Sequence, residues 1–74
     1  MDTEQKRNDD VAYFIAFCIE IYKHAHNMSG SDVSQLFSNT GLMEFLADNF
    51  EPIHTQSPQW ILEEIDEYIH TGNK

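Results

Sequence analysis

The sequence predicts an all-α protein, a compact bundle of four helices in one domain, on three observations. Residues 11–22 read VAYFIAFCIEIY, in which Glu20 is the only charged residue. This run does not alternate polar and apolar residues as a half-buried strand does, and it is too long for one ordinary strand. Later segments repeat apolar residues at helical spacing, and short groups of Gly, Pro, Asn and Ser separate them. At 74 residues the chain makes one domain, expected at 8–72 after a disordered tail at 1–7.

The first long helix is expected at about residues 8–27. On a helical wheel of about 100° per residue, one narrow stripe is centred on Glu20, and every position from 11 to 25 outside it is apolar. The stripe contains Asp9, Tyr13, Ala16, Glu20, Lys23, His24 and Asn27. The remaining arc is wide and apolar, which predicts packing partners on most sides of the helix and burial of Phe14, Phe17 and Ile21.

Two short helices are expected at about residues 30–38 and 41–50. Ser29 has an acid three residues later, which is the spacing of a helix cap, and Gly41 suits the left-handed conformation that ends a helix. Apolar faces are formed by Val33, Leu36 and Phe37 in the first helix and by Leu42, Phe45, Leu46 and Phe50 in the second. Pro52 is expected to end the second helix.

A second long helix is expected at about residues 58–70. Ser57 as the cap and Pro58 at the first helical position form the strongest local start signal in the chain. One face of this helix carries Ile61, Ile65, Tyr68 and Ile69. The other face carries Glu63, Glu64, Asp66 and Glu67.

The charge of the chain is strongly negative and unevenly distributed. Thirteen Asp and Glu residues against four Lys and Arg give a net charge of −9. No Lys or Arg lies between residues 24 and 73, since the four are Lys6, Arg7, Lys23 and Lys74. Nucleic acid and anionic membrane are excluded as direct partners because both are bound through Lys and Arg. A basic protein surface is the expected partner.

The sequence contains neither a membrane span nor a signal peptide. The first ten residues, MDTEQKRNDD, lack an apolar run, and residues 11–22 fall short of the ~20 apolar residues that cross a bilayer. We therefore expect a cytoplasmic protein.

No catalytic or metal-binding pattern stands out, so we predict a protein that is not an enzyme and uses no metal or cofactor. His24 and His26 are two residues apart and point in different directions on a helix, so they do not match a zinc site. Cys18, the single cysteine, falls on the apolar arc and is expected to be a buried thiol. The acidic run at 63–67 lacks the glycine-containing turn of a calcium loop. A helix-turn-helix at 30–50 would carry acids where DNA reading needs basic residues.

The acids of the later helices are the candidate partner-binding residues. They are Glu63, Glu64, Asp66 and Glu67 of the last helix, with Glu44, Asp48 and Glu51 of the preceding short helix. Tyr13 and Trp60 are candidate anchors, because Tyr and Trp are favoured at interfaces. Two other interpretations stay open: an acidic face that only keeps the protein soluble, and aromatic residues that pack at the edge of the core.

Three blocks, at residues 14–37, 41–56 and 60–69, resemble a family of small bacterial proteins of unknown function. The shared features are a Cys-Ile-Glu block followed by a tyrosine, a Ser-Gly turn, a short helix ending in Leu-Phe, a His-Thr pair and an acidic final helix. Here they occur as Cys18-Ile19-Glu20 with Tyr22, Ser29-Gly30, Leu36-Phe37, His54-Thr55 and Glu63-Glu64-Ile65-Asp66. The chain departs in reading EEID instead of EDID, and in Gln56-Ser57-Pro58 where glycine is common.

The resemblance implies a partner, because genes of this family are often found beside one for an ADP-ribosyltransferase-like toxin. It therefore implies an antitoxin or accessory role for the chain. A self-associating structural or regulatory protein without a toxin partner is the alternative, and a homo-oligomer stays open. The third interpretation is an enzyme that uses His54 with nearby acids.

Overall fold

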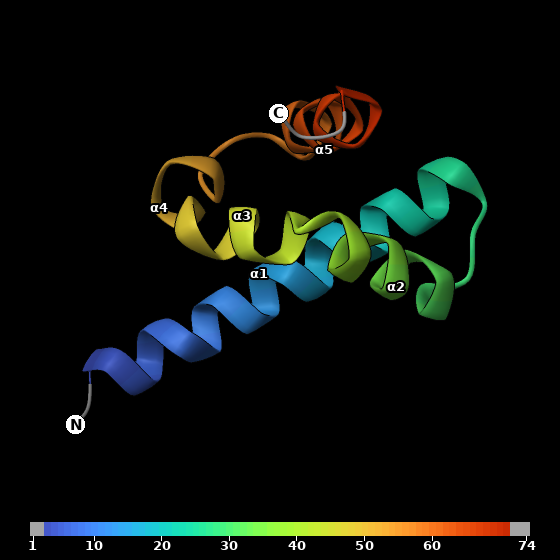
Figure 1. Ribbon diagram of the computed structural model, residues 1–74. Coiled ribbons are helices and arrows are strands. Elements are labelled where there is room, and N and C mark those ends of the chain that lie inside the picture. Colours follow the sequence, from blue (N-terminus) through green and yellow to red (C-terminus); the bar gives the residue numbers. More distant parts are fainter. Residues whose placement is uncertain (1–2, 72–74) are drawn as a thin grey trace.

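The computed structural model describes the backbone of residues 3–71 and the side chains of residues 8–71. Within this part of the chain there are five helices and no strand, which confirms the all-α prediction. The helices are α1 (Thr3–His26), α2 (Gly30–Thr40), α3 (Leu42–Asp48), α4 (Phe50–Ile53) and α5 (Pro58–Thr71). The helices α2, α3 and α5 all pack against α1, and the N-terminal part of α1 extends beyond them (Figure 1).

The long helix α1 begins at Thr3, five residues before the predicted start near residue 8. Residues 4–7, EQKR, are good helix formers and contain no Gly or Pro, so nothing delays the helix. The helix ends as predicted near Asn27, which adopts a left-handed φ of 55°. The Met28 N–H then donates to the Lys23 carbonyl at 3.0 Å, a bond typical of helix ends closed by a left-handed residue.

The predicted caps of the later helices are present. The Asp32 N–H donates to Ser29 Oγ at 3.0 Å at the start of α2. At the start of α5 the Trp60 N–H donates to Ser57 Oγ at 3.1 Å. Gly41 separates α2 from α3 with a φ of 79°, and its N–H donates to carbonyls in the last turn of α2. These local signals therefore fix where α2 and α5 begin and where α2 ends.

The prediction of four helices is wrong, because the segment expected as one helix at 41–50 forms two, α3 and α4. The break is at Asn49, whose backbone is not helical and whose side-chain amide donates to the Phe45 carbonyl at 2.9 Å. Asparagine side chains compete in this way with the helical backbone bonds. Pro52 does not end the helix as predicted; it lies in the single turn of α4, where no N–H is needed.

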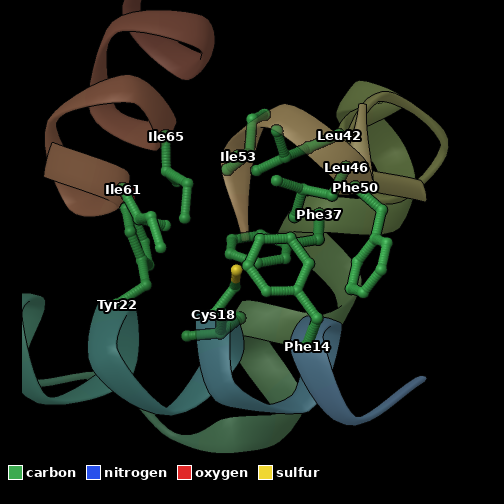
Figure 2. Packing of buried hydrophobic residues seen from close by; sticks show 11 residues of the cluster. Phe14, Cys18, Tyr22, Phe37, Leu42, Leu46, Phe50, Ile53, Ile61 and Ile65 are labelled. Carbon is green, nitrogen blue, oxygen red and sulfur yellow. The ribbon is translucent and has the colours of Figure 1, made fainter. Parts of the chain in front are cut away.

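The core is formed by side chains from all five helices (Figure 2). It consists of Phe14, Cys18, Tyr22, Val33, Phe37, Leu42, Leu46, Phe50, Ile53, Ile61 and Ile65. Edge-on ring contacts join α1 to its neighbours: Phe14 meets Phe50 with centroids 5.5 Å apart, and Tyr22 meets Phe37 at 5.6 Å. Cys18 has no exposed surface, and burial raises the pKa of its thiol to about 12.

The prediction that α1 is covered on most sides is only partly right. Its buried residues, Phe14, Cys18 and Tyr22, are spaced four apart and form one line. Ile21 is half-buried, but Phe17 is 41% exposed and Tyr13 is 78% exposed. The shorter helices are too few to surround a helix of 24 residues, so part of its apolar arc faces solvent.

Candidate interaction surface

The junction between α3 and α5 is closed by an aromatic pair. The rings of Phe45 and Tyr68 are tilted by 37° with centroids 4.8 Å apart, and both side chains are half-buried. The Tyr68 hydroxyl donates to the Thr40 carbonyl at 3.3 Å, in the last turn of α2. Tyr68 therefore ties α5 to the C-terminal end of α2 and to α3, and this fixes where the acids of the two helices lie.

Both helices joined by this aromatic pair carry acids. On α3, Asp48 follows Phe45 by three residues, and Glu44 precedes Asp48 by four, so these positions lie along one side of the helix. On α5, Glu64 precedes Tyr68 by four residues and Glu67 is its direct neighbour. The four acids therefore belong to the two helices that the aromatic pair joins. Glu64 is half-buried, and the other three are exposed.

The remaining predicted residues of this region lie on α4 and α5. Glu63 is exposed on α5, four residues before Glu67. Glu51 is exposed on α4, which packs on α3. Trp60 is 38% exposed in the first turn of α5, three residues before Glu63. We call this set the α3–α5 acidic surface: Glu44, Asp48, Glu51, Trp60, Glu63, Glu64 and Glu67.

Asp66, predicted as a binding residue, has a partner within the chain. Its Oδ1 lies 2.8 Å from His26 Nε2, which joins the end of α1 to α5 across 40 residues of sequence. The His26 ring stacks on Tyr22 with centroids 4.1 Å apart. Burial raises the pKa of the Tyr22 hydroxyl, and the charge of Asp66 raises it further. The sequence predicts that His26 lies near the end of the first helix. No local pattern indicates that it pairs with a residue 40 positions later.

Tyr13 does not lie on the α3–α5 acidic surface. It belongs to α1, and it is 13 residues from His26, which contacts α5. At about 100° per residue, this separation places the two side chains about 140° apart around the helix. The structure therefore separates the two predicted anchors: Trp60 accompanies the acids, and Tyr13 faces another side of the molecule.

Basic side chains are concentrated on α1. Between residues 8 and 71 the structure describes one Lys or Arg, which is Lys23. Its Nζ lies 3.5 Å from Glu20, and His24 Nε2 lies 2.9 Å from the same carboxylate. The bond from His24 and then the charge of Lys23 lower the pKa of Glu20. The helices α2 to α5 thus carry acids without any Lys or Arg among their residues.

His54 has a structural role at the end of α4. Its Nδ1–H donates to the Phe50 carbonyl at 2.8 Å, and its ring stacks on Phe50 with centroids 4.2 Å apart. Among the described side chains, no three His, Cys, Asp or Glu residues gather closely enough to hold a metal ion. None of the described helices is long and apolar enough to cross a membrane.

The comparison with known proteins identifies the class to which the chain belongs. Residues 13–71 match a family described as "Protein of unknown function (DUF3791)", which covers all five helices in part or in full. The chain is a member of this family, which confirms the resemblance to a small domain family of unknown function. No curated protein and no solved structure matches the chain.

Proposed function

We propose that this protein is a non-enzymatic interaction module that binds a basic protein partner through its α3–α5 acidic surface. One observation carries the proposal: the three consecutive helices α3 to α5 all carry exposed acids, and no Lys or Arg lies between residues 24 and 73. Such a field speeds the encounter with a basic surface and disfavours acidic partners.

The partner that fits best is a toxin encoded beside the protein in a bacterial genome, as the family resemblance implies. An ADP-ribosyltransferase binds the pyrophosphate of NAD, and a site for pyrophosphate is basic. A helix such as α5, with Glu63 and Glu67 exposed one turn apart, is suited to occupy that site. The chain would then act as an antitoxin or accessory protein in the cytoplasm.

The residues of the surface contribute in different ways. Trp60 is the apolar anchor, because it is partly exposed and lies one turn before the acids of α5. On α5, Glu63 and Glu67 contribute most of the electrostatic attraction, since both are exposed and Glu64 is half-buried. Asp66 contributes less to binding because its carboxylate is already paired with His26.

Co-expression with the product of the neighbouring gene tests the proposal. The expected result is co-elution at physiological salt, weakened several-fold by Glu63→Gln combined with Glu67→Gln, mainly through a slower association rate. The matched control is Asp9→Asn combined with Asp32→Asn, which changes the net charge equally on α1 and α2, where both residues are exposed. Elution of the chain alone, or equal weakening by both double variants, contradicts the proposal.

A further inference from the structure

Histidines are the side chains that can add positive charge to the part of the chain that forms the α3–α5 acidic surface. No Lys or Arg lies between residues 24 and 73, whereas His26, His54 and His70 all lie in this range. Histidine is the side chain whose charge ordinarily changes between pH 5 and 8. The charge around the surface therefore depends on pH and not on fixed cations.

His26 is held against the acids of α5 through one of its two ring nitrogens. Its Nε2–H donates to Asp66 Oδ1 at 2.8 Å, and the ring stacks on Tyr22 with centroids 4.1 Å apart. The side chains of His26 and Asp66 are 35% and 34% exposed, so water reaches the pair. Because the carboxylate accepts the bond from Nε2, Nδ1 is the nitrogen that can gain a proton.

His54 and His70 are also bonded through one nitrogen, which leaves the other to gain a proton. The Nδ1–H of His54 faces the carbonyls of Phe50 and Glu51 at 2.8 and 3.0 Å. The Nδ1–H of His70 donates to the Asp66 carbonyl at 2.8 Å. A carbonyl only accepts hydrogen bonds, so Nδ1 carries the proton in both rings and Nε2 is the nitrogen that can gain one.

The charged groups around these histidines are mainly acids. Glu67 precedes His70 by three residues, on the same side of α5. The helices packed nearby contribute Glu20, Lys23 and His24 on α1, Asp32 on α2, and Glu44 and Asp48 on α3. Lys23 is the one Lys or Arg that the structure describes between residues 8 and 71, and its Nζ lies 3.5 Å from Glu20. Protons on the three histidines are therefore the charges that oppose the acids of α4 and α5.

We propose that pH controls the binding of a basic partner to the α3–α5 acidic surface through these three histidines. The inference rests on the proposed function and adds its regulation. With neutral histidines, the surface and its surroundings present negative charge that attracts the partner. Protonation places positive charge beside the acids and repels the same partner. Mild acidification therefore releases the partner, at a pH where carboxylates, which ordinarily titrate near pH 4, still attract it.

Binding of a deca-lysine peptide at pH 8 and at pH 6, followed by tryptophan fluorescence, tests this inference. Trp60 is the only tryptophan of the chain and the proposed anchor, so its emission reports on the surface itself. The peptide keeps its charge over this range because lysine ordinarily titrates near pH 10. At low ionic strength the dissociation constant should rise about five- to eightfold at pH 6, as three charges that each weaken binding about twofold would give.

Replacement of the histidines assigns the effect. The triple variant His26→Gln, His54→Gln and His70→Gln should bind the peptide equally at both pH values, and circular dichroism verifies that it is helical. His70→Gln alone, at an exposed position of α5 outside the core, should remove part of the change. The matched control is His24→Gln, exposed on α1 and paired with Glu20, which should keep the full change.

The possible failures are distinguishable. Equal dissociation constants of the unaltered chain at pH 8 and pH 6 would overturn the regulation and leave the proposed function standing. A change that the triple variant retains, or that His24→Gln abolishes, would also overturn it, because other groups would then be responsible. Absence of binding at both pH values would overturn the proposed function and the regulation that rests on it.

Discussion

At the scale of single residues, the interior of the protein holds two groups that must keep their protons. Cys18 has no exposed surface, and burial raises the pKa of its thiol from 9.0 to about 12. Tyr22 is buried beside it in the core, and both its burial and the charge of Asp66 raise its pKa. Neither group gains from ionising in the folded state, because a buried thiolate or phenolate would lose its hydration.

These two groups predict loss of stability in alkali. The folded protein holds their protons more tightly than the unfolded chain, so their contribution is fully present below pH 9. It declines as the pH rises from 9 toward 12, the range between the unfolded and folded values for Cys18. The free energy of unfolding, measured by urea titration at several pH values, should fall over this range. Cys18→Ala should flatten the fall; the same slope in both proteins would contradict the assignment.

At the scale of the helices, the ends are fixed by a few residues with special backbone or capping chemistry. Gly41 holds the α2–α3 turn in the left-handed region, with a φ of 79°. A Cβ added there would lie 3.5 Å from the Tyr68 hydroxyl, an ordinary contact, so the cost of a side chain would come from the backbone. Gly30 is different, because it begins α2 without a positive φ and a Cβ would meet only Lys23 Cδ at 4.0 Å.

The two glycines therefore form a matched pair for mutation. Gly41→Ala should lower the free energy of unfolding by about 1–2 kcal/mol, the cost of the left-handed conformation for a residue with a Cβ. Gly30→Ala should leave it unchanged or raise it by up to about 1 kcal/mol, because alanine restricts the unfolded chain. Chemical denaturation of both variants measures the difference. Equal effects would show that backbone conformation does not distinguish the two positions.

Local signals explain which parts of the fold were predictable from the sequence. Ser29, Ser57 and Gly41 act on their own neighbours within a few residues, so the ends that they determine were found. The break at Asn49 was not predicted because asparagine also occurs within helices. Here the helix is interrupted where the Asn49 side-chain amide donates to the Phe45 carbonyl. The start of α1 at Thr3 differs from the predicted start near residue 8 because residues 4–7 carry no local signal that marks a helix start.

For the candidate site, the sequence predicts which residues are present but not how residues of different helices are placed relative to one another. The acids of α3 to α5 and the partial exposure of Trp60 follow from helical spacing within single elements. The pairing of Asp66 with His26 and the position of Tyr13 away from α5 depend on how helices distant in the sequence pack together. Periodicity within one helix carries no information about that packing, so neither feature could be derived from the sequence.

At the scale of the whole molecule, the distribution of charge distinguishes α1 from the later helices. The helix α1 spans ~36 Å at about 1.5 Å per residue and sets the longest dimension of the molecule, 38 Å. It contains three of the four Lys and Arg residues of the chain. The α3–α5 acidic surface contains only acids and aromatic side chains. The proposal therefore assigns the basic partner to α3 to α5 and not to α1.

The most direct measurement of the central claim is a nuclear magnetic resonance titration of the isotope-labelled chain with the product of its neighbouring gene. We predict that the backbone amides that shift or broaden most at physiological salt are those of α3 to α5, with the Trp60 indole N–H among them. The changes should diminish as salt is added. Shifts confined to α1 or α2, or a spectrum that the partner leaves unchanged, would contradict the account.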